Sequence, residues 1–266
     1  MVLDAIADHA PFDKCALRVY AKGSYANNTN VRADSDVDIA VECTEAVYWE
    51  QSQPGVHIPA GTYQGIWTPQ KLREELTVAL INKFEKGVDP SGSTAIRVHS
   101  SSARVDADVV PCFTYEYHFD KLNFLTGTKI FKVDNSTLVN YPAQQLANGK
   151  NKNLRTDLAY KKTVRILKRI ENALAEKGAP ALPSYFIECL AYNCPDAVFA
   201  EPSWTKTVRE ALVHIWNGLA GNEPAEQTAR WREANGCVYL FHGAQSWDRA
   251  KGRAFAQGAW TYLGLK

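Results

Sequence analysis

The stretch that decides the fold is KGSYANNTNVRADSDVDIAV, residues 22–41, in which a Gly-Ser pair precedes a strand that opens with acidic side chains. Side chains alternate across a β-strand, so Asp36 and Asp38 share one face. Carboxylates this close repel each other unless a cation lies between them. The stretch therefore predicts a strand that binds a cation, whereas Asp34, just before it, is interpreted as a turn residue.

A second acidic stretch, RVDADVVP at residues 104–111, places Asp106 and Asp108 on one face of another strand. We expect this strand to lie beside the first and to bring a third carboxylate to the same place. Three carboxylates can hold two divalent cations about 3.5–4 Å apart, which activates an attacking oxygen and stabilises a leaving one. The expected ions are two Mg²⁺, with Mn²⁺ as a substitute, because Mg²⁺ binds a few carboxylates together with substrate phosphates.

The Gly-Ser pair upstream adds hydrogen-bond donors for a phosphate beside the predicted cation site. Gly23 lets the backbone approach a phosphate closely, and Ser24 adds a hydroxyl donor. Backbone amides at the start of a short following helix are further donors to an anion. Gly23 and Ser24 are therefore predicted to bind the phosphates of a substrate.

Composition and charge narrow the class of protein. Hydrophobic residues make up 45% and aromatic residues 11% of the 266, enough for a real core and too many for a disordered chain. The net charge of +1 excludes a protein that is basic overall, so any positive site must be local. We find no signal peptide and no apolar run long enough to span a membrane. The six cysteines form no CxxC pair or Cys/His metal spacing, which favours buried thiols in a reducing cytoplasm.

The pattern along the chain predicts an α+β protein with two parts. Residues 1–140 form a core with a mixed sheet and flanking helices, and residues 141–266 form a helical lobe that closes a cleft on it. The predicted strands are 15–22, 36–43, 95–99, 104–113 and an edge strand at 128–133, with a helix at 69–86 and a long loop or hairpin insertion at 44–68. The predicted helices of the second part are 154–177, 183–193, 203–219 and 245–262.

Two groups of polar residues in the second part are candidates for ligand binding. Lys161, Arg165 and Lys168 recur at helical spacing and form a basic stripe, either an ordinary solvated face or a funnel for an anion. Ser184 and Tyr185 follow a proline at a helix start, where serine can donate to a phosphate and tyrosine can stack on a base. For Tyr185 a core aromatic remains the alternative.

The order of these motifs resembles the nucleotidyltransferase superfamily of DNA polymerase beta type, and within it the bacterial cGAS/DncV-like nucleotidyltransferases (CD-NTases). The resemblance lies in GSY followed by DSDVDIAV and VDADVVP, in TDLAYKKTVRILKR (156–169), which is similar to the helix entering the second lobe, and in LPSYFIECLAY (182–192), which is similar to the Ser-Tyr helix. It covers roughly residues 15–195. Little is recognisable from residue 196 onward.

The resemblance implies roles for individual residues. Asp36, Asp38 and Asp108 are the implied catalytic residues and metal ligands. Asp108 is preferred to Asp106 because the family's third aspartate lies three residues before a proline, here Pro111. The implied nucleotide-binding residues are Gly23, Ser24, Lys161, Lys168, Ser184 and Tyr185, with Asn151 or Asn153 as reader of a uracil edge.

The resemblance also implies an activity. The expected reaction joins nucleoside triphosphates (ATP, UTP or others) into a cyclic di- or trinucleotide with release of pyrophosphate, as a CBASS anti-phage signal sensed by an effector protein. We expect a cytoplasmic monomer that needs no double-stranded nucleic acid, because no face is basic enough for a duplex. The alternatives are nucleotidyl transfer to an antibiotic, protein or RNA end, and a catalytically silent nucleotide- or RNA-binding module.

Overall fold

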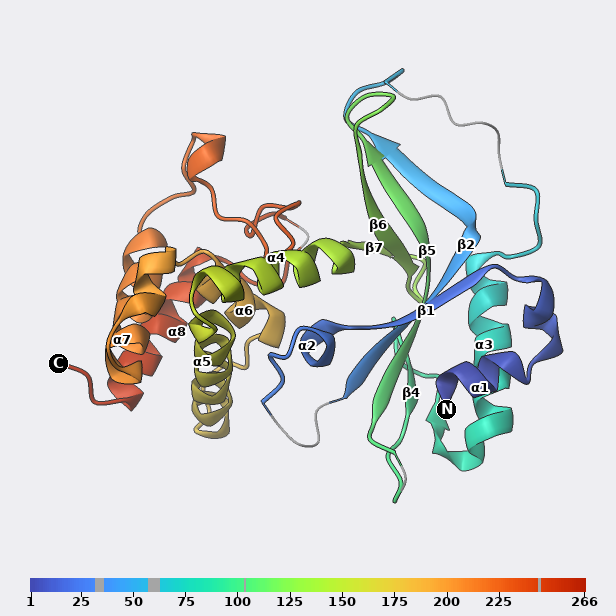
Figure 1. The fold of residues 1–266 in the computed structure, drawn as a ribbon, viewed down its shortest axis with the longest axis horizontal. Coiled ribbons are helices and arrows are strands. Elements are labelled where there is room, and N and C mark those ends of the chain that lie inside the picture. The colour runs from blue at the N-terminus through green and yellow to red at the C-terminus, as the bar shows by residue number, and fades with distance from the viewer. Residues whose placement is uncertain (32–35, 57–62, 103, 244) are drawn as a thin grey trace. The chain divides into compact units, whose positions relative to one another are not determined.

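The computed structural model describes residues 1–31, 36–56, 63–102, 104–243 and 245–266; the predicted turn residue Asp34 lies outside them. The chain forms two compact units (Figure 1). The first comprises Met1–Ala26 and Arg32–Pro142, and the second comprises Asn27–Val31 and Ala143–Lys266. The short segment Asn27–Val31 thus belongs with the helices that follow it much later in the sequence, which no pattern indicated.

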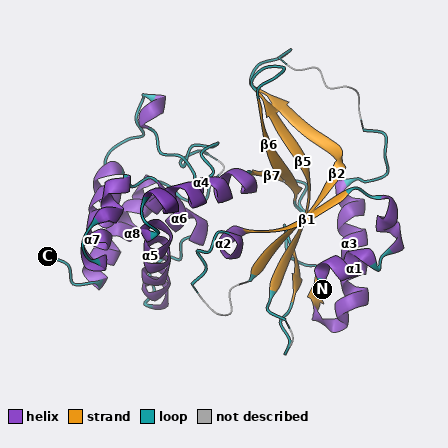
Figure 2. Ribbon diagram, viewed as in Figure 1, coloured by secondary structure: helices purple, strands orange, loops and turns teal. Residues whose placement is uncertain are grey.

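The first unit is built on a mixed sheet, as the sequence predicts (Figure 2). Its main path runs β1-β2-β5-β4-β3, and β6 pairs with both β5 and β7. The pair β2–β5 is parallel, and the other pairs are antiparallel. The strands in the described residues are β1 (Leu17–Lys22), β2 (Val37–Gln51), β3 (Val88–Asp89), β4 (Ile96–Val98), β5 (Ala107–His118), β6 (Phe124–Phe131) and β7 (Thr137–Asn140).

Two predictions for this unit were wrong. Part of the expected loop 44–68 continues β2 as far as Gln51, after a register shift between Cys43 and Val47. The residues past the shift are good strand formers, and the turn residues begin only at Pro54. The expected edge strand at 128–133 is β6, an inner strand, because the short strand β7 pairs with its outer side.

Helices α1 (Val2–Ala7) and α3 (Pro69–Phe84) pack on the apolar face of the sheet. Thr68 caps α3 by accepting a hydrogen bond from the Lys71 amide, and the helix ends near its predicted boundary. Its fully buried face carries leucines at helical spacing, and β2, β4 and β5 contribute the facing side chains. The central members are Leu72, Leu76, Leu80, Val41, Ile96, Val109 and Phe113. The acidic side chains therefore emerge on the opposite face.

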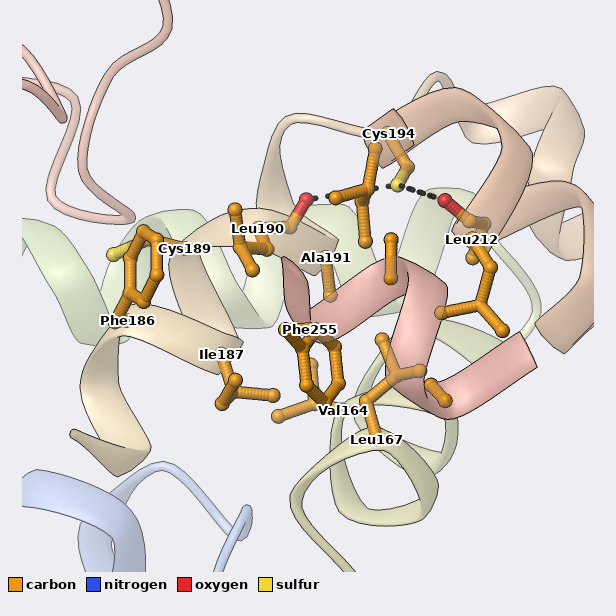
Figure 3. Packing of buried hydrophobic residues seen from close by; sticks show 14 of the residues in the cluster. Val164, Leu167, Phe186, Ile187, Cys189, Leu190, Ala191, Cys194, Leu212 and Phe255 are labelled. Atoms are coloured by element: carbon orange, nitrogen blue, oxygen red, sulfur yellow. Dashed lines mark hydrogen bonds between the residues drawn. The ribbon is translucent and has the colours of Figure 1, made fainter. Parts of the chain in front are cut away.

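The second unit is a helical bundle around its own core. Its helices are α4 (Pro142–Arg155), α5 (Ala159–Glu176), α6 (Ser184–Tyr192), α7 (Trp204–Gly218) and α8 (Arg249–Tyr262). Figure 3 shows Leu167, Phe186, Leu190 and Phe255 within this core. Short elements complete the described chain: α2 (Gly23–Ala26) and 3₁₀ turns at Ala10–Lys14, Glu85–Gly87, Asp196–Ala200 and Gln227–Ala229.

The predicted helix 154–177 is interrupted at its start. Asp157 and Leu158 have left-handed backbone angles (φ 47° and 62°), so α4 ends at Arg155 and α5 begins at Ala159. The helices expected at 183–193, 203–219 and 245–262 are present, the last beginning at Arg249. Among the described residues, no helix combines the length and apolarity that a bilayer crossing requires.

Replacing Leu76 with alanine tests the packing of α3 on the sheet. Leu76 is fully buried, so the change should lower the free energy of unfolding by about 2–5 kcal/mol. Val78, on the same helix, is 46% exposed, and Val78→Ala should change stability by no more than about 0.5 kcal/mol. Denaturant unfolding followed by circular dichroism measures both, and equal losses would contradict this packing.

Candidate active site

The parallel pairing of β2 with β5 brings the two acidic stretches together. Asp38 and Asp108 are register partners across this pair. Asp36 directly precedes β2, and it contacts the same arginine as Asp108 does. The structure thus groups the acidic positions named by the sequence at one end of the two strands, within a single compact unit.

Arg97, a residue that the sequence analysis did not select, lies between two of these carboxylates. Its Nη2 is 3.1 Å from Asp36 Oδ2, and its Nε is 3.4 Å from Asp108 Oδ1. It extends from β4, where it is the register partner of Asp108. The nearby carboxylates of Asp108 and Asp36 raise the pKa of Arg97. One cationic group can therefore reach both carboxylates, which is what a bound cation requires.

The donor set fits a hard divalent cation. All three side chains offer carboxylate oxygens, the ligands that Mg²⁺ and Mn²⁺ prefer. In the described part of the chain no three His, Cys, Asp or Glu side chains are already grouped as a metal site. Arg97 accounts for this, because its guanidinium holds Asp36 and Asp108 on either side of itself. A metal ion at these positions would take the place of the Arg97 guanidinium.

The protonation of Asp38 is linked to cation binding. Burial raises the pKa of Asp38, and the negative charges of Asp108 and Asp36 raise it further, while Lys22 opposes them. A divalent cation would reverse this shift, because it favours the charged carboxylate. Since a protonated Asp38 is a poor ligand, cation binding should weaken as the pH falls toward its raised pKa.

Gly23 is required at its position for two independent reasons. Its backbone has φ +68°, a left-handed value that glycine adopts without strain. A Cβ built there would lie 2.1 Å from Oδ2 of Asp38, so any side chain would displace that carboxylate. Ser24 is the next residue in α2 and is partly exposed. The Gly-Ser turn therefore abuts the acidic strand directly.

Asp106 has a different environment from Asp108. Its Oδ1 accepts a hydrogen bond from the Ser100 backbone amide and lies 3.9 Å from Nδ1 of His99. Asp106 therefore stabilises the turn between β4 and β5. This difference favours Asp108 as the third acidic residue of the site.

In the helical unit, Lys161 offers a positive charge suited to an anion. The side chain is partly buried, and burial lowers the pKa of its ammonium group. No ion pair among the described residues involves it. Its backbone amide donates to Asn153 Oδ1, so Asn153 caps the start of α5. Asn151 is exposed on α4.

Lys168 departs from the predicted basic stripe. Its side chain is only 3% exposed, and Nζ lies 3.2 Å from both Glu188 Oε2 and Thr29 Oγ1. This position favours a structural role for Lys168 over the nucleotide contact that the resemblance implied. Helical spacing alone could not reveal that a buried carboxylate on α6 would face it.

Ser184 and Tyr185 have different environments: Ser184 is exposed, and the side chain of Tyr185 is held by hydrogen bonds. Ser184 is exposed at the first position of α6. The hydroxyl of Tyr185 donates to Glu233 Oε2 at 3.2 Å and accepts from Asn235 Nδ2 at 3.2 Å. Its ring makes an edge contact with Trp247, and burial raises its pKa. The structure thus favours the core-aromatic alternative for most of the Tyr185 side chain.

Replacing Arg97 with glutamine tests the cation site. Removing the competing guanidinium should tighten Mn²⁺ binding about two- to fivefold, the range expected for a partly exposed ion pair. Isothermal titration calorimetry measures the affinity, and Arg253→Gln, far along the sequence on α8, is the matched control. Unchanged or weaker Mn²⁺ binding in Arg97→Gln would show that the cation does not share these carboxylates.

Comparison with known proteins identifies the family of this chain. Residues 147–264 match the family model for the cGAS/DncV-like nucleotidyltransferase C-terminal helical domain. The cyclic dipyrimidine nucleotide synthase CdnE of Legionella pneumophila is 37% identical over 254 residues, 93% of this chain and 84% of that protein.

Solved structures agree over nearly the whole chain. The Elizabethkingia meningoseptica CdnE cyclic dinucleotide synthase with GTP and Apcpp has a TM-score of 0.82 and 31% identity, covering 99% of this chain and 90% of that one. The Rhodothermus marinus CdnE c-UMP-AMP synthase with Apcpp and Upnpp has a TM-score of 0.79 and 27% identity, covering 99% and 91%. The resemblance and the enzyme class predicted from the sequence are therefore confirmed: the chain belongs to the CdnE-type cGAS/DncV-like nucleotidyltransferases, a bacterial family of cyclic nucleotide synthases.

Proposed function

We propose that this enzyme joins two nucleoside triphosphates into a cyclic dinucleotide and releases two pyrophosphates. The observation that carries the proposal is the cross-strand pairing of Asp38 with Asp108, with Arg97 held between Asp108 and Asp36. A dinucleotide is favoured over a trinucleotide because the relatives described above are all named for dinucleotide products.

The chemistry needs positioning and neutralisation of charge more than a protein base. Asp36, Asp38 and Asp108 would hold two divalent cations, Mg²⁺ or Mn²⁺, whose charge would lower the pKa of the acceptor hydroxyl and neutralise the departing pyrophosphate. Gly23 allows phosphate oxygens to approach the backbone beside Asp38, and Ser24 donates to them.

The helical unit contributes the second set of nucleotide contacts. Lys161 binds the triphosphate, for which its partly buried ammonium group is suited because no ion pair within the described residues engages it. Ser184 donates to a phosphate from the exposed start of α6, and the accessible edge of Tyr185 contacts a base. Lys168 is left out of this set, because its charge is already neutralised by Glu188.

The reaction consists of two successive transfers. A ribose hydroxyl of one nucleotide attacks the α-phosphorus of the other, the bond to pyrophosphate breaks, and a linear dinucleotide triphosphate results. The dinucleotide then turns round in the site, and a ribose hydroxyl of its other nucleotide attacks the remaining α-phosphorus. The bond from that phosphorus to the second pyrophosphate breaks, and the ring closes. The proton lost at each attack passes to solvent or to a nearby carboxylate.

The choice of bases is the feature on which the relatives differ. Their names specify dipyrimidine and UMP-AMP products, and one is solved with GTP and an ATP analogue. In this chain Asn151 is the better candidate for reading a base edge, because it is exposed while Asn153 caps α5. We propose that the product acts on a separate effector protein in the cytoplasm, and that a monomer works without double-stranded nucleic acid.

Incubation of the pure protein with labelled nucleoside triphosphates, singly and in pairs, with Mg²⁺ or Mn²⁺ tests the activity. The expected product resists phosphatase and has the mass of a cyclic dinucleotide. Asp38→Asn and Asp108→Asn should each reduce its formation by at least about a hundredfold, because each removes a charge from the cation site.

Asp106→Asn is the matched control, since Asp106 lies on the same stretch but holds a turn. It should retain most of the activity. Full activity in Asp38→Asn would refute the assignment of the acidic residues. Label that appears only on added RNA, protein or antibiotic would instead support a transferase with another acceptor, and no transfer at all would support a silent binding module.

A further inference from the structure

The helical unit contains a buried polar cluster that none of the proposed nucleotide contacts requires. We call it the Glu188 network; its members are Asn27, Thr29, Gln145, Lys168 and Glu188. All of these residues belong to the same compact unit, because Asn27–Val31 is grouped with the helices.

The carboxylate of Glu188 is the centre of the network. Its Oε1 accepts from Asn27 Nδ2 at 2.6 Å and from Gln145 Nε2 at 2.9 Å. Its Oε2 accepts from Thr29 Oγ1 at 2.8 Å and from Lys168 Nζ at 3.2 Å. The Glu188 side chain is 1% exposed, so these four donors replace water around the charge.

The network holds one short segment of the chain, residues 27–29, by hydrogen bonds. Asn27 and Thr29 are each 0% exposed and bind Glu188 through their side chains. Between them, the carbonyl oxygen of Asn28 accepts from Arg165 Nη1 at 2.6 Å. Every residue of this piece is therefore tied to the helical unit by a polar contact.

Gly149 of α4 shows that the position of Asn27 is closely fitted. A Cβ at Gly149 would lie 2.6 Å from Asn27 Oδ1. Glycine within a helix costs about 1 kcal/mol relative to alanine, so a reason is expected for its presence. Here the missing side chain leaves the space that Asn27 occupies.

The anchored piece lies in the sequence between two parts of the candidate active site. Ala26, the last residue of α2, directly precedes Asn27, and α2 begins with Gly23 and Ser24. After Val31 the chain returns to the first unit, where Asp36 precedes β2. The residues that bind phosphate and metal in our proposal are thus covalently joined to both sides of the anchored segment.

We propose that the Glu188 network is a positioning device for catalysis: by fixing residues 27–29 on the helical unit, it sets the conformation of the adjoining chain that carries Gly23 and Ser24. The inference rests on the proposed nucleotidyl transfer. Glu188, Lys168, Asn27 and Thr29 are positioning residues in this account, since none of them contacts substrate.

Burial of a charged pair needs a reason beyond stability. Removing two charges from water costs free energy. A buried ion pair therefore often stabilises a protein less than apolar residues of the same size would. The charged pair instead fixes the positions of its hydrogen-bond donors, because a carboxylate accepts hydrogen bonds only from particular directions. A second buried lysine, Lys152, donates instead to the Cys194 carbonyl and to Asp196, both in the part of the chain that follows α6.

The test compares Thr29→Val with Thr29→Ser. Valine keeps the shape of threonine but removes the donor to Glu188, whereas serine keeps the donor. Thr163→Val is the matched control: Thr163 is also fully buried and loses a hydroxyl, but its Oγ1 bonds only within α5, to the Ala159 carbonyl. Steady-state kinetics of cyclic dinucleotide formation and hydrogen–deuterium exchange of peptides covering residues 23–31 are measured for all three.

Thr29→Val should lower kcat about ten- to hundredfold with a change in KM below about threefold, because the reacting groups are misplaced while most binding contacts remain. It should also speed amide exchange in residues 23–31. Thr29→Ser should restore both to near the wild type, and Thr163→Val should change neither.

Each other outcome has a defined meaning. Faster exchange with unchanged kcat in Thr29→Val would refute positioning, and unchanged exchange would refute the anchor itself. Equal losses of kcat in Thr29→Val and Thr163→Val would reduce the effect to general destabilisation and overturn the inference. A wild-type protein that makes no nucleotide product would instead overturn the proposed function, and the inference with it.

Discussion

The repulsion between carboxylates on two parallel strands is the constraint on which the site depends. Pairing of β2 with β5 places Asp38 beside Asp108, an arrangement that costs free energy unless positive charge is near. Arg97 supplies that charge between Asp108 and Asp36, and Lys22 supplies it at the register position across from Asp38 on β1. A site that needs such compensation is prepared to bind cations.

The same sheet shows how a buried charge is stabilised when it has no catalytic part. Glu42 lies on the face of β2 that also carries Asp38, but it is fully buried. It accepts hydrogen bonds from Arg18, Tyr20 and Thr114, so its oxygens are satisfied by the protein itself. The contrast separates a structural carboxylate, enclosed by fixed donors, from acidic residues that remain partly exposed beside Arg97.

In the helical unit, buried charges are paired with donors and acceptors from distant parts of the chain. Glu188 organises donors from the sequence-distant segment Asn27–Val31 and from α4 and α5. Lys152 lies among the rings of Tyr160, Tyr192 and Phe199 and is neutralised by Asp196. Such clusters specify one arrangement, because any other packing would leave a charge without a partner.

The sequence by itself determined the fold class and most element positions, and it named the acidic residues that the structure brings together. Strand alternation and helical spacing depend on residues that are close together in the sequence, so they can be recognised without the structure. Only the tertiary structure decided that Arg97 lies between Asp36 and Asp108 and that Lys168 is buried against Glu188. These are contacts between residues far apart in the chain, and a helical stripe of lysines looks the same whether water or a buried carboxylate faces it. The assignment of Asn27–Val31 to the helical unit could not be predicted for the same reason. The residues that this segment contacts lie on helices more than a hundred residues further along the sequence.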